Sequence, residues 1–459
     1  MRRTALVLLA FASLGLGRSR PVGAQAPDNA QAAAPAPTFN KDVAPILYAN
    51  CVVCHRPGEV APMSLLTFAD ARPWARAMKT KVTAGEMPPW AADPKYGDFK
   101  NKPTLTQAQA STIAAWADAG APEGDGAAPA APVFQEAGWS TQIGRPPDQI
   151  IDAPFEFDVP ASGDVPTFTI WVKIPFRDDR FVEAMQLRPT NPRVVHHSSL
   201  SLGDLPPKTK LGKGAVYDGG PVLDGVPLFS DGRVYRAMSG DEFGYPLLFY
   251  VPGGGLLRFP EGIAKRLTAG KYFSWGMHYV TDGKPEKVRM RLALWFAKKT
   301  VTHQADTWTA NDKKFVGGKD VTKAVPNIPP YADNFEIVGT VTFPDDVTLY
   351  SMWPHMHWRG KDMTFVLIRP NGKEETLLSV PKYNPNWQTT YELVKPMKIP
   401  ARSTIKAIAH YDNSVKNPRN PAPDQEVKWG PQGINEMFLP FLEVSVDKDD
   451  LRFQDVPLR

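Results

Sequence analysis

The stretch Cys51-Val52-Val53-Cys54-His55 contains the only two cysteines of the chain and decides the fold expected for its N-terminal part. Two cysteines three positions apart, followed directly by a histidine, form the attachment motif of haem c. Both sulfurs become thioethers and the histidine ligates the iron. A redox dithiol or half of a zinc knuckle needs no histidine at that position. The motif therefore predicts one covalent haem c held by Cys51, Cys54 and His55.

Helix signals flank this motif and predict an all-α, cytochrome c-like haem domain over residues 38–122. Residues 43–47 carry an apolar helical stripe that leads into the motif. Further along, Thr106 and Gln109 have the spacing of a capping box, and Gly120 is placed to end the helix that follows. Two such helices crossing beside the haem would resemble the cytochrome c fold.

The sixth iron ligand is expected from the loop between the two helices. Met87 is our choice, because it precedes Pro88-Pro89 and cytochromes of this kind commonly present a methionine just before a proline. Met63 and Met78 are the competing candidates. Met78 falls in a helix-like stretch that favours a core role, and Met63 is close to the motif in sequence. Thioether ligation raises the iron potential, which favours electron transfer over oxygen binding.

The N-terminus predicts export. Arg2 and Arg3 precede an apolar run over residues 5–16, and Ala24-Gln25-Ala26 offers small residues for cleavage. The run is short for a membrane span. We interpret residues 1–26 as a cleaved signal peptide and expect a periplasmic protein with no membrane span in the mature chain. An uncleaved membrane anchor is the alternative.

Charge excludes one class of partner. Four of the 53 basic side chains (Arg2, Arg3, Arg18 and Arg20) lie in the predicted signal, so most of the formal surplus of +5 belongs to targeting. The remaining chain is close to neutral, and nothing in it favours nucleic acid.

The remaining chain is predicted to be β. A lead over residues 27–37 and a linker assigned to residues 123–145 are rich in Ala and Pro. Beyond them, short apolar stretches broken by Pro and Gly favour two tandem all-β, jelly-roll-like sandwich domains, at 146–325 and 326–459. The stretches read as strands are 168–174, 194–202, 289–296, 337–343 and 363–368.

Seven histidines lie outside the haem motif, and their pattern suggests metal binding. The pair His355-Met356-His357 points to one face of a strand and can chelate one ion. The adjacent pair His196-His197 can share an ion only if the strand bulges or ends there, or if the two rings use different nitrogens. Taken singly, each pair could also be one core and one surface histidine. The seven are His196, His197, His278, His303, His355, His357 and His410.

The order of these residues resembles the copper type II, ascorbate-dependent monooxygenases, which hydroxylate peptidylglycine or dopamine. In that family a His-His pair and a later histidine hold one copper in the first β domain. A His-x-His pair and a later methionine hold a second copper in the next domain. The matching positions are His196, His197 and His278 for the first ion, and His355, His357 and Met437 for the second. The resemblance covers about two thirds of the chain.

The resemblance implies two copper ions and O2-dependent hydroxylation of a small organic substrate. It makes the His196 site the electron relay and assigns the catalytic copper to His355, His357 and Met437. A thioether ligand independently favours copper over zinc, calcium or magnesium. We expect the tethered haem to supply electrons one at a time, itself reduced by a periplasmic electron donor. His303 and His410 are read as structural or surface residues, with His410 at most a neighbour of a ligand.

Substrate anchoring departs from the peptide-amidating branch of the family. Trp353, Leu439 and Phe441 stand where that branch anchors a carboxylate, which favours an apolar or aromatic substrate. The family's disulfides are also absent. Two other functions stay open. One is a copper and haem electron-transfer or binding protein without oxygenase activity, and the other is a haem carrier fused to metal-free β modules.

Overall fold

The computed structural model describes residues 35–451, apart from residues 101, 103, 135–138, 164, 166, 205–244, 312–326 and 431–432. The predicted signal peptide and most of the predicted lead therefore lie outside the described residues. Part of the predicted boundary between the two β domains also falls in a range that is not described.

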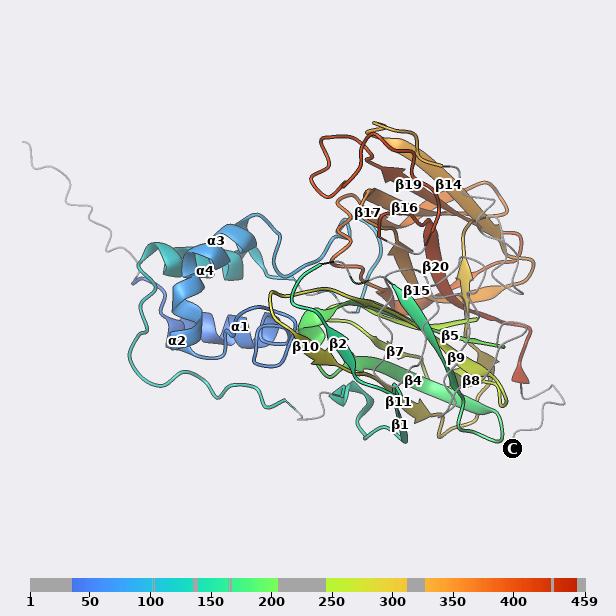
Figure 1. Ribbon diagram of the computed structural model, residues 1–459, viewed down its shortest axis with the longest axis horizontal. Coiled ribbons are helices and arrows are strands. Elements are labelled where there is room, and N and C mark those ends of the chain that lie inside the picture. Colours follow the sequence, from blue (N-terminus) through green and yellow to red (C-terminus); the bar gives the residue numbers. More distant parts are fainter. Residues whose placement is uncertain are drawn as a thin grey trace, which may run out of the picture. The chain divides into compact units, whose positions relative to one another are not determined.

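The described N-terminal part contains short helices (Figure 1). Phe39, Leu47 and Trp116 are almost fully buried in a core of their own. The helices are η1 (Phe39–Val43), α1 (Ala44–Asn50), α2 (Phe68–Ala71), η2 (Arg72–Trp74), α3 (Ala75–Thr83) and α4 (Gln107–Asp118), with two later short turns, η3 (Thr141–Ile143) and η4 (Pro192–Val194).

The predicted capping box is confirmed at the start of α4. The side chain of Thr106 accepts a hydrogen bond from the backbone of Gln109, and the Gln109 side chain accepts one from the backbone of Thr106. The helix ends before Gly120, whose φ of 84° is a conformation that glycine adopts without strain. Local sequence chemistry therefore fixed both ends of this helix.

Two sheets enclose the first β core, which buries Trp275, Met277 and Leu292 among many other apolar side chains. A short third pair, β2 (Phe157–Val159) with β10 (Glu286–Val288), lies beside them. One sheet has the order β1 (Gln149–Asp152), β11 (Met290–Phe296), β4 (Arg180–Pro189), β8 (Ile263–Leu267) and β12 (His303–Gln304), with β7 (Leu256–Arg258) paired to β4; the other has the order β3 (Phe168–Lys173), β9 (Tyr272–Tyr279), β5 (Val195–Gly203) and β6 (Tyr245–Tyr250).

Two four-stranded sheets enclose the second β core, in which Met352, Phe365 and Leu442 are fully buried. Strands β15 and β20 run side by side in one of them (Figure 1). The first sheet has the order β13 (Asp306–Thr309), β20 (Leu439–Val446), β15 (Val347–His355) and β18 (Tyr391–Ile399); the second has the order β14 (Phe335–Thr342), β19 (Thr404–Tyr411), β16 (Gly360–Ile368) and β17 (Glu374–Val380).

All five stretches predicted as strands from alternation and β-branched residues form strands. They correspond to β3, β5, β11, β14 and β16, with ends that differ by a few residues. The apolar positions of these stretches face the two cores, as period-two alternation predicts.

The predicted fold class is wrong. Among the described residues there is no separate all-α cytochrome c domain over residues 38–122 followed by two independent jelly rolls. The described chain is mainly β, its helices are short, and residues from Pro37 onward form one compact unit. The physical reason is that this segment completes its packing on the sheets: Trp90 and Phe99 pack against Tyr391 of the second β core, and Phe99 pairs with Leu393.

The predicted linker begins packed against the helices. The backbone amides of Phe39 and Asn40 donate to the carbonyls of Pro122 and Glu123, and the Asn40 side chain donates to Gly126 at 2.7 Å. The predicted domain boundaries are not decided by these contacts and stay predictions.

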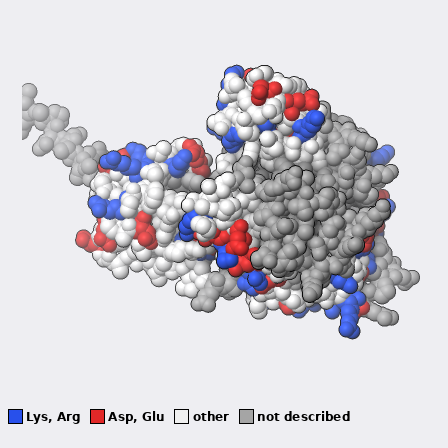
Figure 2. All heavy atoms as spheres, viewed as in Figure 1, with Lys and Arg blue, Asp and Glu red and all other residues white. Residues whose placement is uncertain are grey.

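Charges of both signs are interspersed over the described residues on the face shown in Figure 2. That view shows no broad field of one sign among those residues, which agrees with the nearly neutral composition.

Candidate metal centre

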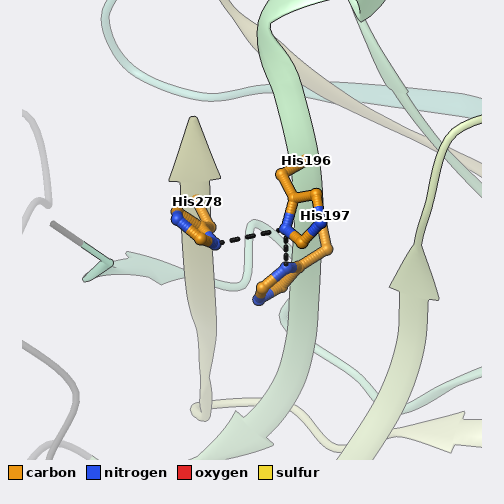
Figure 3. A group of neighbouring side chains, drawn as sticks. All are labelled: His196, His197 and His278. Carbon is orange, nitrogen blue, oxygen red and sulfur yellow. Dashed lines mark hydrogen bonds between the residues drawn. The ribbon is translucent and has the colours of Figure 1, made fainter. Parts of the chain in front are cut away.

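Three histidines from β5 and β9 converge on one point (Figure 3). In the pairing of these strands, His197 lies directly opposite His278, and the register shifts between Val195 and His197. This irregularity is the bulge that the adjacent pair requires, because in a regular strand His196 and His197 would point to opposite faces. The bulge that the sequence analysis required for His196 and His197 to share an ion is therefore present.

The three imidazoles are close enough to share one ion. Nδ1 of His196 lies 3.0 Å from Nδ1 of His197 and 3.4 Å from Nδ1 of His278. One ring nitrogen from each residue can be chosen so that all three lie within 4.8 Å of one another. Neighbouring ring nitrogens at such distances are the arrangement that a metal ion satisfies.

Burial keeps these imidazoles neutral. Loss of solvent lowers the pKa of His278 to about 3, helped by the nearby His196 and His357. Burial also holds the pKa of His197 well below its ordinary value, with further lowering from the four other histidines of the site. A neutral imidazole offers a lone pair to a metal, so the cluster is ready for a cation at neutral pH.

The second predicted pair also lies together, at the end of β15. The ring centroids of His355 and His357 are 5.2 Å apart, and both side chains are buried. Nδ1 of His355 contacts the side-chain oxygen of Gln388, which makes Nε2 the candidate ligand atom of that ring. Nδ1 of His357 lies 3.1 Å from the carbonyl oxygen of Asn435.

Met437 lines the same small cavity as this pair. It precedes β20 and is buried in an apolar cluster with Trp353, Leu439 and Phe441. Its backbone carbonyl accepts a hydrogen bond from the hydroxyl of Tyr411 at 2.8 Å. A thioether beside two imidazoles is a donor set that suits copper, above all its reduced ion.

Glu436 is a buried carboxylate to which the sequence analysis assigned no role. It connects the segment just before β20 with the loop after β15. Glu436 accepts hydrogen bonds from the backbone amides of His357 and Arg359 at 2.7 and 2.6 Å. Burial raises the pKa of Glu436 to about 7 despite these donors. Arg359 is itself buried and donates to Asn413 at 2.8 Å. These hydrogen bonds join segments that are distant in the sequence, so residue spacing alone could not reveal them.

The two histidine sets meet at a single cavity, whereas the sequence analysis expects one ion in each of two domains. The ring centroids of His197 and His355 are 6.3 Å apart. A cavity of about 30 Å³ is lined by His197 from the first set and by His355, His357 and Met437 from the second. Four of the six predicted metal-binding residues therefore line this cavity, and the other two, His196 and His278, lie against His197.

The haem motif borders a second, much larger cavity of about 730 Å³ that is mainly apolar. Cys51, Cys54 and His55 line it at one side and His196 at another. Its volume is in the range of cofactor pockets. Nδ1 of His55 is buried without a hydrogen-bond partner in the described part of the chain. The cavity and the orphaned imidazole nitrogen both fit a covalently attached haem.

The three candidate methionines all line this cavity. Met87 does so from the loop after α3, together with the neighbouring Pro88. Met63 and Met78 line it as well, and Met78 also belongs to the helical core. The choice of Met87 as sixth ligand stays a prediction.

An aromatic wall divides the two cavities; we define it as Phe249, Trp353 and Phe441, which line both. The rings of Phe249 and Trp353 stack with centroids 4.1 Å apart, and those of Trp353 and Phe441 stack at 5.1 Å. The indole N–H of Trp353 donates to the backbone carbonyl of Gln388 at 2.8 Å. Trp353 and Phe441, which the sequence analysis expects beside an apolar substrate, therefore pack against each other at the edge of the small cavity.

The two remaining histidines lie elsewhere. His303 contacts the hydroxyl of Thr302 at 3.0 Å and the carbonyl of Asp447 at 3.1 Å. His410 lies 2.7 Å from a carboxylate oxygen of Asp362. Neither lines the small cavity.

Comparisons with known proteins do not place the chain in a family. No family model matches it, and no curated protein matches it. Among solved structures, a Paenibacillus xanthan lyase is similar over 66% of this chain and 26% of its own, with 9% identity and a TM-score of 0.16. The Gx strain of infectious bursal disease virus is similar over 66% of this chain and 74% of its own, with 10% identity and a TM-score of 0.17. Likenesses this weak carry no argument.

Among the described residues, no helix combines the length and the apolar character needed to cross a membrane. The residues that precede position 35 are not part of that finding.

Proposed function

We propose that this protein is an exported haem c- and copper-containing oxidoreductase that hydroxylates a small organic substrate with O2. The observation that carries the proposal is the convergence of five histidines and Met437 beside a haem-sized cavity that reaches the Cys51–His55 motif. Such a reaction inserts one oxygen atom into a C–H bond and reduces the other to water, which requires two electrons and two protons.

Bound copper would supply one-electron chemistry and oxygen activation, and bound haem c would supply the electrons. The chain's own residues would hold these groups. His196, His197 and His278 would present neutral nitrogens to one ion, and His355, His357 and Met437 would present two nitrogens and a sulfur to the other. Gln388 would orient His355, and the aromatic wall lines the small cavity with apolar rings.

Electron supply from the haem follows from the position of His196. This residue lines the large cavity together with the haem motif and also belongs to the three-histidine cluster. A haem in that cavity would lie beside a metal ligand without any diffusing donor, and attachment to the same chain keeps its local concentration high. The signal-like N-terminus supports a periplasmic location and a periplasmic electron donor for the haem.

Stopped-flow absorbance tests this proposal. The haem of copper-loaded protein is reduced, mixed with O2 and followed at its absorption bands. We expect faster haem reoxidation in the wild type than in His196→Ala, with His303→Ala, outside both cavities, behaving as the wild type. Equal rates in wild type and His196→Ala would overturn electron transfer through this site.

One observation favours a second function, electron transfer without oxygenation. The cavity beside the metal ligands is only about 30 Å³, and the aromatic wall closes it toward the larger cavity. Oxygen uptake measured across panels of apolar and aromatic compounds distinguishes the two. Uptake that depends on an added compound supports the oxygenase, and uptake that no compound changes supports the carrier.

A further inference from the structure

We infer that the two predicted copper sites form one binuclear centre, in which His197 and His355 face each other across the shared cavity. The inference rests on the proposed copper binding. It differs from the expectation of two independent sites, each within its own β domain.

The positions of the rings give the first argument. His197 lies 4.9 Å from His278 within its own set and 6.3 Å from His355 of the other set, measured between ring centroids. The separation between the sets is therefore little larger than the separation within one.

A network of buried hydrogen bonds connects the sheet that contains β5 and β6 with the sheet that contains β15 and β20. Lys265 of β8 is fully buried and donates to the carbonyl of Pro246 in β6 and to Glu443 in β20 at 3.2 and 3.1 Å. Thr307 of β13 donates to the same carbonyl at 3.1 Å. Strand β6 neighbours the strand that carries His197, and β20 neighbours the strand that carries His355.

The aromatic wall makes the same connection through apolar contact. Phe249 of β6 stacks on Trp353 of β15 and also packs 5.0 Å from Phe441 of β20. Aromatic contacts of this kind and a paired buried lysine both resist separation of the sheets. Separation would expose apolar surface to water and would leave the buried lysine without its carboxylate partner. The short distance between the histidine sets is thus built into the packing.

The volume of the shared cavity limits what can lie between the sets. A cavity of about 30 Å³ has room for one or two molecules the size of water or dioxygen, because one water needs roughly 10–15 Å³ by this measure. An organic substrate does not fit. It would have to react from the side of the aromatic wall, with Trp353 or Phe249 displaced.

Electron paramagnetic resonance on copper-titrated wild-type protein tests the inference without a turnover assay. Apo protein is titrated with Cu(II) to saturation, metal content is measured independently, and the spin signal is integrated. Two interacting Cu(II) ions should give far less than one spin per bound copper, or a broadened signal with a half-field transition. Removing one set in His355→Ala should restore a single, full-intensity signal.

The outcomes separate this inference from the proposed function. Two coppers per chain with full, unbroadened signals that His355→Ala leaves unchanged in shape would overturn the binuclear centre and leave copper binding intact. A wild type that binds no copper would overturn both. His303→Ala is the matched control, since it removes a histidine outside the cavity and should titrate as the wild type.

Discussion

The side-chain oxygen of Gln388 contacts Nδ1 of His355, and the backbone carbonyl of Gln388 accepts the indole hydrogen bond of Trp353. One residue on the loop before β18 therefore fixes both a predicted copper ligand and the centre of the aromatic wall. An acceptor on Nδ1 keeps the proton there and directs Nε2 toward the metal.

Replacing Gln388 by leucine should weaken copper binding at the His355 set. The leucine has similar volume but cannot accept the imidazole proton, and loss of such an outer contact typically costs roughly 10–100-fold in metal affinity. Competition titration with a copper chelator measures the change. Gln304→Leu, on β12, is the control and should leave both affinities unaltered. Unchanged affinity in Gln388→Leu would show that the contact does not orient the ligand.

Removing both cysteines should abolish covalent haem attachment. In Cys51→Ala/Cys54→Ala no thioether can form, so haem should be extracted by denaturation, whereas it should stay on the wild-type polypeptide. The measurement is haem staining of denaturing gels after expression in a strain that matures c-type cytochromes. Wild-type protein without bound haem in that strain would contradict the assignment of the motif.

Removing the buried guanidinium of Arg359 should destabilise the fold. Arg359→Met removes the hydrogen bonds that the side-chain oxygen of Asn413 and the carbonyl of Ile434 accept, and leaving a buried acceptor unsatisfied typically costs about 1–3 kcal/mol. Lys287→Met, which removes an exposed partner of Asp158, should leave the free energy of unfolding nearly unchanged. Urea unfolding of both variants provides the comparison. Similar losses in the two would show that the Arg359 contacts contribute little.

Acid should destabilise the metal-free protein through His278. Its pKa is about 3 in the folded chain and near 6.5 when unfolded, so below pH 6.5 the unfolded chain takes up the proton first. Stability from this group is complete above pH 6.5 and is lost as the pH falls toward 3. His278→Gln lacks this term.

When the pH falls from 6.5 to 5, the unfolding free energy of the wild type should therefore decrease by about 2 kcal/mol more than that of His278→Gln. Denaturant titrations with a chelator present, at both pH values, give the number. A difference that does not change with pH would mean that His278 is not buried as a neutral imidazole.

Local chemistry in the sequence predicted individual elements well. The capping box at Thr106 and the alternating stretches that became β5 and β11 could be recognised from neighbours along the chain alone. The sequence analysis required a bulge if the adjacent residues His196 and His197 were to share an ion, and β5 has a register shift at that place.

Contacts between distant segments could not be predicted in the same way. The helix signals were correct, but the expected all-α domain was not, because Trp90 and Phe99 find their partners on Tyr391 of a distant strand. The approach of His197 to His355 likewise depends on how two sheets face each other. No residue spacing encodes the buried pair of Lys265 and Glu443 that joins those sheets.

Anomalous X-ray diffraction from crystals of haem-loaded, copper-loaded protein tests the central claim most directly. Data at the copper edge should show peaks beside His196, His197 and His278 and beside His355, His357 and Met437. Data at the iron edge should show one peak beside His55. Copper-loaded crystals with no copper peak at any of these histidines would contradict the account.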